Sequence, residues 1–335
     1  MKICVVGAGA IGGLLAARMA QAGERVTVVD VGPHLEAIRA DGLRVTLADG
    51  EKVTARPLLA TDDPARAGPQ DLVILALKAH VIGQVAERLA ALNGPDTMIL
   101  PLQNGLPWWY FQRHGGEFEG HRIATLDPDG RIAAAIDPGR IIGCVVYPAA
   151  EVVAPGVIRH VEGNRFPVGE LDGRTTPRVQ AVADLFNRTG FKSFVLDDIR
   201  GEIWLKLWGN LSFNTISALT HATLEDICRY PLTRRLAADL MGEAQAIANK
   251  LGITFRVPLE KRIEGAEKVG PHKTSTLQDV EAGRALELDA LLGAVIELGA
   301  LVGVPTPHID AVYACAKLLN ETIVRGGVGV RAVKA

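Results

Sequence analysis

The sequence predicts an α/β domain, built on a doubly wound parallel sheet, followed by an all-helical domain. Up to residue 198, short apolar runs alternate with helical patterns, as βαβ units require. The first of these runs leads into a glycine-rich turn, and from residue 200 onward the patterns are helical with almost no strand-like runs. We therefore predict one domain over residues 1–197 and a second over residues 198–335.

The first thirty residues predict a strand, a glycine-rich turn, a helix and a second strand. Residues 2–6 are apolar, LLAARMAQA runs up to Gly23, and RVTVV ends at Asp30. The turn between them matches the pattern G-x-G-x-x-G and consists of Gly7, Ala8, Gly9, Ala10, Ile11 and Gly12. In this pattern the three glycines allow a tight turn, approach of a pyrophosphate and helix packing, and the helix N-terminus attracts phosphate. An acid 18 positions after Gly12 supplies the remaining context, so the turn indicates a Rossmann-type dinucleotide-binding domain rather than a plain glycine-rich turn.

Polar residues follow two further predicted strands. Residues 43–55 predict a hairpin around Asp49-Gly50, and residues 71–77 and 97–100 are apolar runs typical of buried parallel strands. Lys78 follows the first run and Asn104 closely follows the second, at the sheet edge where such folds bind ligands. We expect both at the cofactor site; the alternatives are a surface lysine and a simple Asn-Gly turn. Further strand-like segments lie within 140–170 and at 191–198.

The helical domain is predicted to contain helices at 200–219, 232–251, 256–269 and 276–302, with a shorter one near 308–322. In the first of them, Lys206, Asn210 and Asn214 are spaced by four and form a polar row among tryptophan, leucine and phenylalanine residues. Buried polar groups need partners, so the row must face either solvent or a polar cavity. Burial lowers the pKa of a lysine, so that its ammonium group is able to give up a proton near neutral pH to the oxygen of a carbonyl that has received a hydride.

A second polar group lies near the start of the predicted helix 276–302. Ser275 and Gln278 match a capping box, which places the helix start immediately after Ser275. That helix terminus can hold a substrate carboxylate. Glu287, three turns further along among leucines, is a candidate partner for Lys206. The alternatives are a serine that only caps the helix, and a Glu287 on an exposed stripe with Arg284 and Asp289.

Composition favours a small-molecule function. The net charge is −2, with mixed signs along the chain and no basic block for nucleic acid or an anionic membrane. The four cysteines are far apart without zinc spacing, so we expect reduced thiols, no metal site and a cytoplasmic location. The apolar N-terminus imitates a signal peptide, but its glycines and the strand that follows favour a folded unit. No G-x-S-x-G, H-E-x-x-H or P-loop pattern supports hydrolysis.

Taken together, these residues resemble the ketopantoate reductases (2-dehydropantoate 2-reductases) over essentially the whole chain. The shared motifs are GAGAIGG, LALKA, LQNG, W-L-K-L-x-x-N-x-x-x-N and STLQD. The resemblance implies NADPH-dependent reduction of 2-dehydropantoate to D-pantoate, on the route to pantothenate and coenzyme A, by a homodimer. It makes Lys206 the proton donor, and Glu287 the support of the catalytic end. Asn104, Asn210, Asn214 and Ser275 would hold the substrate, with Asn104 also touching the cofactor.

Three departures from the family pattern bear on the ligands. A further substrate-contacting asparagine of some members is replaced by Leu224 or Thr223. The run Trp108–Phe111 predicts an aromatic-lined cavity, a core segment or a dimer patch.

The third departure concerns the cofactor. An acid after the second strand accepts bonds from the ribose hydroxyls of NAD and repels a 2′-phosphate. Asp30 is such an acid, and Val31 replaces the expected arginine, so we predict NADH over the family's NADPH. Arg25, Lys52 or Arg56 reaching the phosphate is the alternative.

Two other functions stay open from the sequence alone. One is an NADH-linked D-2-hydroxyacid dehydrogenase that acts on a bulkier 2-oxo acid, which the aromatic run and Asp30 favour. The other is a non-catalytic dinucleotide-binding sensor, against which the retention of Lys206, Asn210, Asn214 and Glu287 argues.

Overall fold

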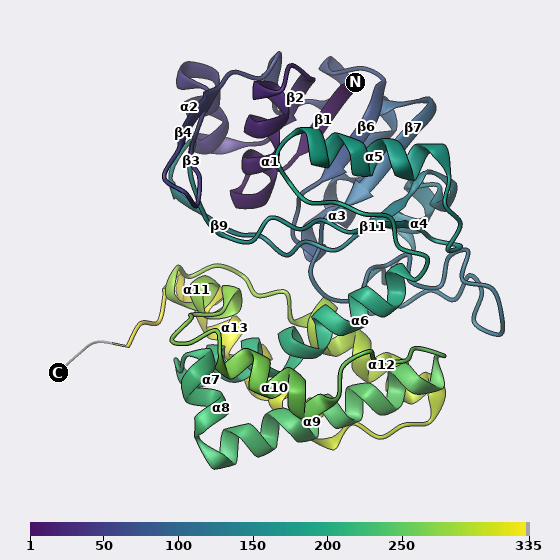
Figure 1. Cartoon of the computed structure of the whole chain (residues 1–335), viewed down its shortest axis with the longest axis vertical. Helices are drawn as coiled ribbons and strands as arrows, with labels where there is room; N and C mark the ends of the chain where they lie inside the picture. The colour runs from purple at the N-terminus through teal and green to yellow at the C-terminus, as the bar shows by residue number, and fades with distance from the viewer. Residues whose placement is uncertain (333–335) are drawn as a thin grey trace. The chain divides into compact units, whose positions relative to one another are not determined.

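The computed structural model describes residues 1–332 and divides into two compact units (Figure 1). The first comprises residues 1–103, 108–122 and 129–199; the second comprises 104–107, 123–128 and the chain from Arg200 onward. The α/β fold followed by a helical domain is thus confirmed. A domain boundary in the sequence between residues 197 and 198 remains our proposal.

A parallel five-stranded sheet forms the centre of the first unit. Its strands are β1 (Lys2–Val6), β2 (Arg25–Val29), β5 (Leu59–Thr61), β6 (Gln70–Leu75) and β7 (Asn93–Pro101). They are ordered β5-β2-β1-β6-β7, and every neighbouring pair is parallel. The chain therefore leaves β1 toward one edge and returns to the other side of it, which makes β1 and β6 the switch point where such sheets bind ligands.

Helix α1 (Ala10–Gln21) packs between this sheet and a second, four-stranded one. The second sheet has the order β4-β3-β10-β9, with strands β3 (Leu43–Thr46), β4 (Lys52–Ala55), β9 (Ala149–Ala154) and β10 (Val157–Glu162). The antiparallel pair β3–β4 confirms the predicted hairpin. A Cβ at Gly13 would lie 2.1 Å from Cδ1 of Ile158, so this glycine allows β10 to approach the helix.

The remaining elements of the first unit connect and flank these sheets. They are α2 (Gly32–Asp41), α3 (Ala79–Val85), α4 (Arg131–Ala135), α5 (Pro177–Arg188), the short antiparallel pair β8 (Ile142–Cys144) and β11 (Val168–Glu170), and 3₁₀ turns at 64–66, 86–92 and 138–140. The strand-like segment predicted at 191–198 forms no continuous strand, but it lies parallel to residues 164–168 through bridges at Lys192 and Val195. The N–H of Lys192 bonds to the carbonyl of Asn164 and the N–H of Leu196 to that of Val168, both at 2.8 Å, while Asn187 binds both backbone groups of Ser193, at 3.0 and 2.9 Å.

The aromatic run belongs to the core of the first unit. Trp108, Trp109, Tyr110 and Phe111 are all at most 5% exposed. A Cβ at Gly143 would lie 3.0 Å from Cη2 of Trp109, so the packing is tight. Of the three alternatives for this run, the structure supports the core segment.

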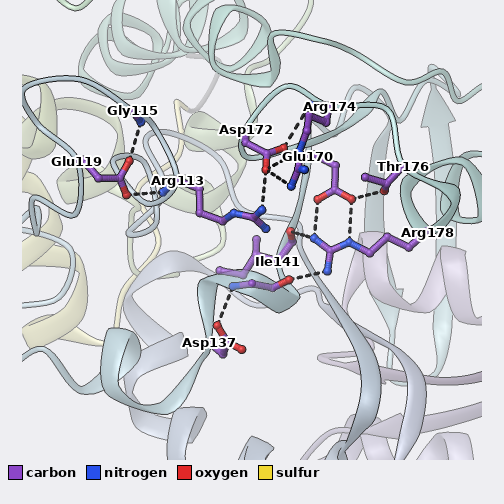
Figure 2. A network of polar contacts seen from close by, with 11 residues as sticks. Arg113, Gly115, Glu119, Asp137, Ile141, Glu170, Asp172, Arg174, Thr176 and Arg178 are labelled. Carbon is purple, nitrogen blue, oxygen red and sulfur yellow. Dashed lines mark hydrogen bonds and ion pairs between the residues drawn. The ribbon is translucent and has the colours of Figure 1, made fainter.

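An ion-pair network holds the end of β11 to the loop that follows the aromatic run (Figure 2). Arg178 donates to the buried Glu170 through Nε, at 2.7 Å, and Nη2, at 2.5 Å, while Thr176 also donates to it. Burial raises the pKa of Glu170, but the hydrogen bonds from Arg178 and Thr176 outweigh it and hold the pKa below its usual value. Arg113 donates to Asp172 at 2.6 Å, which ties the loop to the turn before α5.

The second unit is helical. Its elements are α6 (Ile199–Gly209), the π-helical segment η4 (Asn210–Asn214), α7 (Thr215–Thr220), α8 (Leu224–Arg229), α9 (Pro231–Lys250), α10 (Leu259–Glu267), α11 (Ser275–Glu281), the π-helical segment η5 (Asp289–Gly293), α12 (Ala294–Val302) and α13 (Pro307–Gly326). Ile199 itself is assigned to the first unit. Over residues 1–332, no helix combines the length and apolar character of a membrane span.

The single helix predicted over 276–302 is wrong, because the chain turns out of it after Glu281. Gly283 adopts φ +67°, where a side chain would be strained. The N–H of Arg284 bonds to the carbonyl of Asp279 at 2.9 Å, and that of Gly283 to Val280 at 3.2 Å, which is a Schellman ending. Residues 282–287 are consequently a loop between two helices.

Candidate functional site

The glycine turn has the geometry that a dinucleotide needs. Gly7 adopts φ +89°, and a Cβ there would lie 2.7 Å from the carbonyl oxygen of Ala76. A Cβ at Gly12 would lie 1.8 Å from the carbonyl oxygen of Gly7, so only glycine allows α1 to start here. A Cβ at Gly9 would meet nothing within 4 Å, so this side of the turn is open. The first amides of α1 have no acceptor inside the helix and suit a pyrophosphate.

Asp30 and His34 hold the two backbone groups of Ala8 inside this turn. The Asp30 carboxylate accepts from the Ala8 N–H through Oδ2 and from the Val31 N–H through Oδ1, both at 2.7 Å. The Gly156 N–H donates to Nδ1 of His34 at 3.1 Å, so Nε2 carries the proton and donates to the Ala8 carbonyl at 2.8 Å. A carboxylate accepts about four hydrogen bonds, so these contacts leave capacity for ribose hydroxyls.

Two of the three cations proposed to serve a 2′-phosphate lie elsewhere. Arg25 begins β2, about 16 Å of strand from Asp30, which follows the other end. Arg56 donates to the carbonyl of Ala40 at 2.9 Å, near the far end of α2.

A further cation and a further acid lie beside the end of β2. The N–H of Asp30 bonds to the Thr61 carbonyl, and Asp62 follows directly. Arg39 pairs with this Asp62 at 3.1 Å and with Glu36 at 2.6 Å. Its charge is thus already shared between two acids, which supports the predicted preference for a ribose without phosphate.

Lys78 lies just beyond the carboxyl end of β6, next to β1 at the switch point. It is half-buried, has φ −64° and ψ 146°, and immediately precedes α3. Its position at this edge supports the predicted contact with the cofactor. The role of Lys78 in binding stays a prediction.

In the second unit, Lys206 and Asn104 are directly bonded. Nζ of Lys206 donates to Oδ1 of Asn104 at 2.6 Å, so the asparagine amide acts as the acceptor. The turn that carries Asn104 is fixed by its neighbours: the N–H of Leu106 bonds to the carbonyl of Ala290 at 2.8 Å. Gly105 adopts φ +82°, and a Cβ there would lie 2.2 Å from the same carbonyl oxygen. Asn104 therefore does more than form an Asn-Gly turn.

A π-helical segment changes the geometry of the predicted polar row. In an ideal α-helix, four residues turn about 40° past a full circle, so Lys206 and Asn214 would be about 80° apart. Residues 210–214 are π-helical, with i→i+5 bonding and more residues per turn, which cancels part of this drift. Oγ of Ser212 donates to the carbonyls of Trp208, at 2.9 Å, and Gly209, at 3.3 Å, and so satisfies the disturbed turn. Lys206, Asn210 and Asn214 are all half-buried along one row.

The predicted cap at Ser275 is wrong, because Thr274 caps α11. Oγ1 of Thr274 accepts from the N–H of Leu277 at 3.3 Å, and Gln278 donates to the carbonyl of Lys273 instead of closing a capping box. Thr274 has the extended backbone that an N-cap needs, so the helix begins one residue early. Ser275 accepts from Nδ2 of Asn214 at 3.4 Å, which joins two predicted substrate-binding residues.

This correction separates capping from binding in experiment. Thr274→Ala is expected to lower the free energy of unfolding by about 1 kcal/mol, because a cap is lost. Ser275→Ala is expected to change it by less than about 0.5 kcal/mol, and to raise KM for the substrate. Urea denaturation and steady-state kinetics measure the two effects. A larger loss of stability in Ser275→Ala than in Thr274→Ala would contradict the assignment.

Glu287 lies in the loop 282–287, not three turns along a helix. It is half-buried between Leu286 and Leu288, which are 6% and 2% exposed. The alternative of an exposed stripe is not supported, since Arg284 bonds to Asp279 at 2.7 Å and Asp289 accepts from Tyr313 at 2.5 Å. The two charges proposed to share a stripe with Glu287 are thus each bonded to another residue.

Thr223 has a structural role. Its hydroxyl accepts from the N–H of Asp226 at 3.3 Å, while the Asp226 carboxylate accepts from the Thr223 N–H at 3.0 Å. This is a capping box at the start of α8, a helix that the sequence analysis did not assign. The residue at this departure from the family pattern is therefore engaged within its own helix.

Three residues with roles described above, His34, Gly13 and Thr274, are not predicted from the sequence. No local pattern in the sequence marks the role of His34, because its contacts with Ala8 and Gly156 join distant parts of the chain. Among residues 1–332 no group of three or more potential metal ligands is found.

The first unit has a glycine turn at the switch point of a parallel sheet, and the helical unit has a lysine bonded to an asparagine. Together these features define a dinucleotide-dependent oxidoreductase. The family model described as "Ketopantoate reductase PanE/ApbA" matches residues 3–173, and that described as "Ketopantoate reductase PanE/ApbA C terminal" matches residues 198–320. The chain belongs to the ketopantoate reductase family.

Individual relatives are similar to this chain over nearly its whole length. A 2-dehydropantoate 2-reductase of Mesorhizobium japonicum is 52% identical and covers 95% of this chain and 98% of its own length. A crystal structure of a candidate ketopantoate reductase from Ralstonia solanacearum MolK2 is 42% identical, with a TM-score of 0.92 over 98% of this chain and 99% of that one. A D-mandelate dehydrogenase solved with NADH and anilino(oxo)acetate has a TM-score of 0.81 over 96% and 99% of the chains; at 21% identity this likeness concerns the fold alone.

Proposed function

We propose that this protein reduces 2-dehydropantoate to D-pantoate with a nicotinamide dinucleotide. The observation that carries the proposal is the Lys206–Asn104 hydrogen bond at the end of a half-buried polar row, in a chain 52% identical to a 2-dehydropantoate 2-reductase. Family membership favours this substrate over the bulkier 2-oxo acid considered above. The buried aromatic run also removes one argument for a larger cavity.

The first unit would hold the dinucleotide. The open side of Gly9 and the first turn of α1 suit the pyrophosphate, and Asp30 would accept from the ribose. When bound, the cofactor supplies a hydride to the keto carbon. Lys78 at the carboxyl end of β6 would contribute a positive charge at the same sheet edge.

The second unit would hold the substrate and supply the proton. The Lys206 ammonium, oriented by the amide oxygen of Asn104, donates a proton to the keto oxygen as negative charge develops there. Asn210, Asn214 and Ser275 offer amide and hydroxyl groups to the carboxylate and hydroxyl of the substrate. Glu287 supports the catalytic end of this set. A homodimer, as the family resemblance implies, is part of the proposal, and its mass is measurable by light scattering.

A panel of 2-oxo acids with NADH and NADPH tests the function. We expect kcat/KM for 2-dehydropantoate to exceed that for phenylglyoxylate, a bulkier aromatic 2-oxo acid, by at least about tenfold. Oxidation of the dinucleotide is followed by absorbance, and the chirality of the product is checked by chromatography. A preference for phenylglyoxylate would favour the D-2-hydroxyacid dehydrogenase, whereas dinucleotide binding without turnover of any 2-oxo acid would favour the sensor.

A further inference from the structure

The loop 282–287, which carries Glu287, is fixed at its start by the end of α11. The backbone N–H of Arg284 bonds to the Asp279 carbonyl at 2.9 Å, and Nε of Arg284 bonds to the Asp279 carboxylate at 2.7 Å. Both of these contacts lie two residues before Leu286 and three before Glu287. A further constraint on the loop acts closer to Glu287.

That constraint comes from α13. Oδ1 of Asn320 accepts a hydrogen bond from the backbone N–H of Leu286 at 2.9 Å. The two residues are 34 positions apart, so the contact exists only through the tertiary fold. Leu286 is 6% exposed, and an N–H next to a buried side chain is costly to leave without an acceptor. Asparagine is also a poor helix former, so local helix propensity does not account for its presence on α13.

The backbone after Leu286 leads directly to the proposed reacting groups. Glu287 is the next residue, and its carbonyl accepts from the Leu291 N–H at 3.2 Å as the following helix begins. The Ala290 carbonyl then accepts from Leu106, two residues after Asn104, the acceptor for Lys206. A shift of Leu286 would therefore displace Glu287, and through Ala290 the turn of Asn104.

We propose that Asn320 is a positioning residue, which holds Leu286 so that Glu287 and the Asn104 turn face Lys206 correctly. The proposal deepens the function above and depends on it. Asn320 acts through the backbone, so its loss is expected to affect turnover more than binding of the dinucleotide, because all of the proposed dinucleotide residues except Asn104 lie in the first unit.

Two substitutions separate the hydrogen bond from packing. Asn320→Leu removes the acceptor but keeps a side chain branched at Cγ with the same number of heavy atoms, while Asn320→Asp keeps an oxygen in its place. We expect Asn320→Leu to lower kcat about 10- to 100-fold, with the Kd for the dinucleotide unchanged within about twofold, and Asn320→Asp to recover most of the loss. Asn249→Leu, at an exposed asparagine of α9, is the matched control and should keep normal kcat.

A double-mutant cycle tests the path through Glu287. If Asn320 acts through Glu287, Asn320→Leu is expected to cause a much smaller loss of kcat in a Glu287→Gln background than in the wild type. Equal losses in both backgrounds would overturn this path and indicate general destabilisation. Thermal melting followed by circular dichroism verifies that each variant is folded.

Hydrogen exchange at Leu286 tests the contact independently of catalysis. The amide is expected to exchange at least about tenfold faster in Asn320→Leu, and at near the wild-type rate in Asn320→Asp. Unchanged exchange at Leu286 in Asn320→Leu overturns the proposal. So does an unchanged kcat in Asn320→Leu, provided that the wild type reduces 2-dehydropantoate. A wild type that reduces no 2-oxo acid would instead refute the function, and with it the catalytic role of Asn320.

Discussion

Lys206→Ala is expected to lower kcat for 2-dehydropantoate by about 10²–10⁴-fold and to leave the Kd of the dinucleotide nearly unchanged. The ammonium stabilises charge that develops on the keto oxygen only in the transition state, so the loss appears mainly in turnover. Stopped-flow reduction and a dinucleotide titration measure the two quantities. A variant with more than half of the normal kcat would exclude Lys206 as the proton donor.

Lys206→Arg distinguishes proton donation from charge. Arginine keeps a positive charge and donates hydrogen bonds, but it does not release its proton in proteins. We expect this variant to bind the 2-oxo acid and to remain at least about tenfold slower than the wild type. Lys250→Ala, at an exposed lysine of α9, is the matched control and should keep normal kinetics.

The wild type is expected to prefer NADH to NADPH by roughly ten- to a hundredfold in kcat/KM. Asp30 would face the 2′-phosphate, and repulsion between two negative groups at partly screened range costs on the order of 1–3 kcal/mol. The cation expected next to it is replaced by Val31. A clear preference for NADPH would show that the interpretation of Asp30 is wrong.

Val31→Arg is the informative variant for this preference. Val31 is 67% exposed, so an arginine there disturbs no packing. It should raise kcat/KM with NADPH at least about tenfold and change that with NADH little. Asp30→Ala by itself is harder to interpret, because the carboxylate also accepts a hydrogen bond from the Ala8 N–H. Its loss would therefore change the glycine turn as well as the charge. An unchanged kcat/KM with NADPH in Val31→Arg would indicate that the 2′-phosphate binds away from this residue.

Much of the fold follows from local patterns in the sequence. The buried strands show as apolar runs, and the first helix of the second unit shows as a polar row among large apolar residues. The glycines of the turn were recognised because each has a steric reason that no other residue meets, as the 1.8 Å contact at Gly12 demonstrates. The ends of helices are harder to predict from the sequence. Threonine and serine are both good N-cap residues, and only the backbone conformation shows that Thr274 rather than Ser275 is the N-cap.

The sequence by itself determined the two fold classes, the glycine turn and the candidate residues of the site, because these depend on periodicity and backbone sterics over a few residues. Only the tertiary structure decided how those residues are used. Lys206 and Asn104 are 102 residues apart, Asp30 and Ala8 are 22 apart, and Asn320 and Leu286 are 34 apart. A hydrogen bond acts over about 3 Å, so such partners exist only once packing has brought distant segments together.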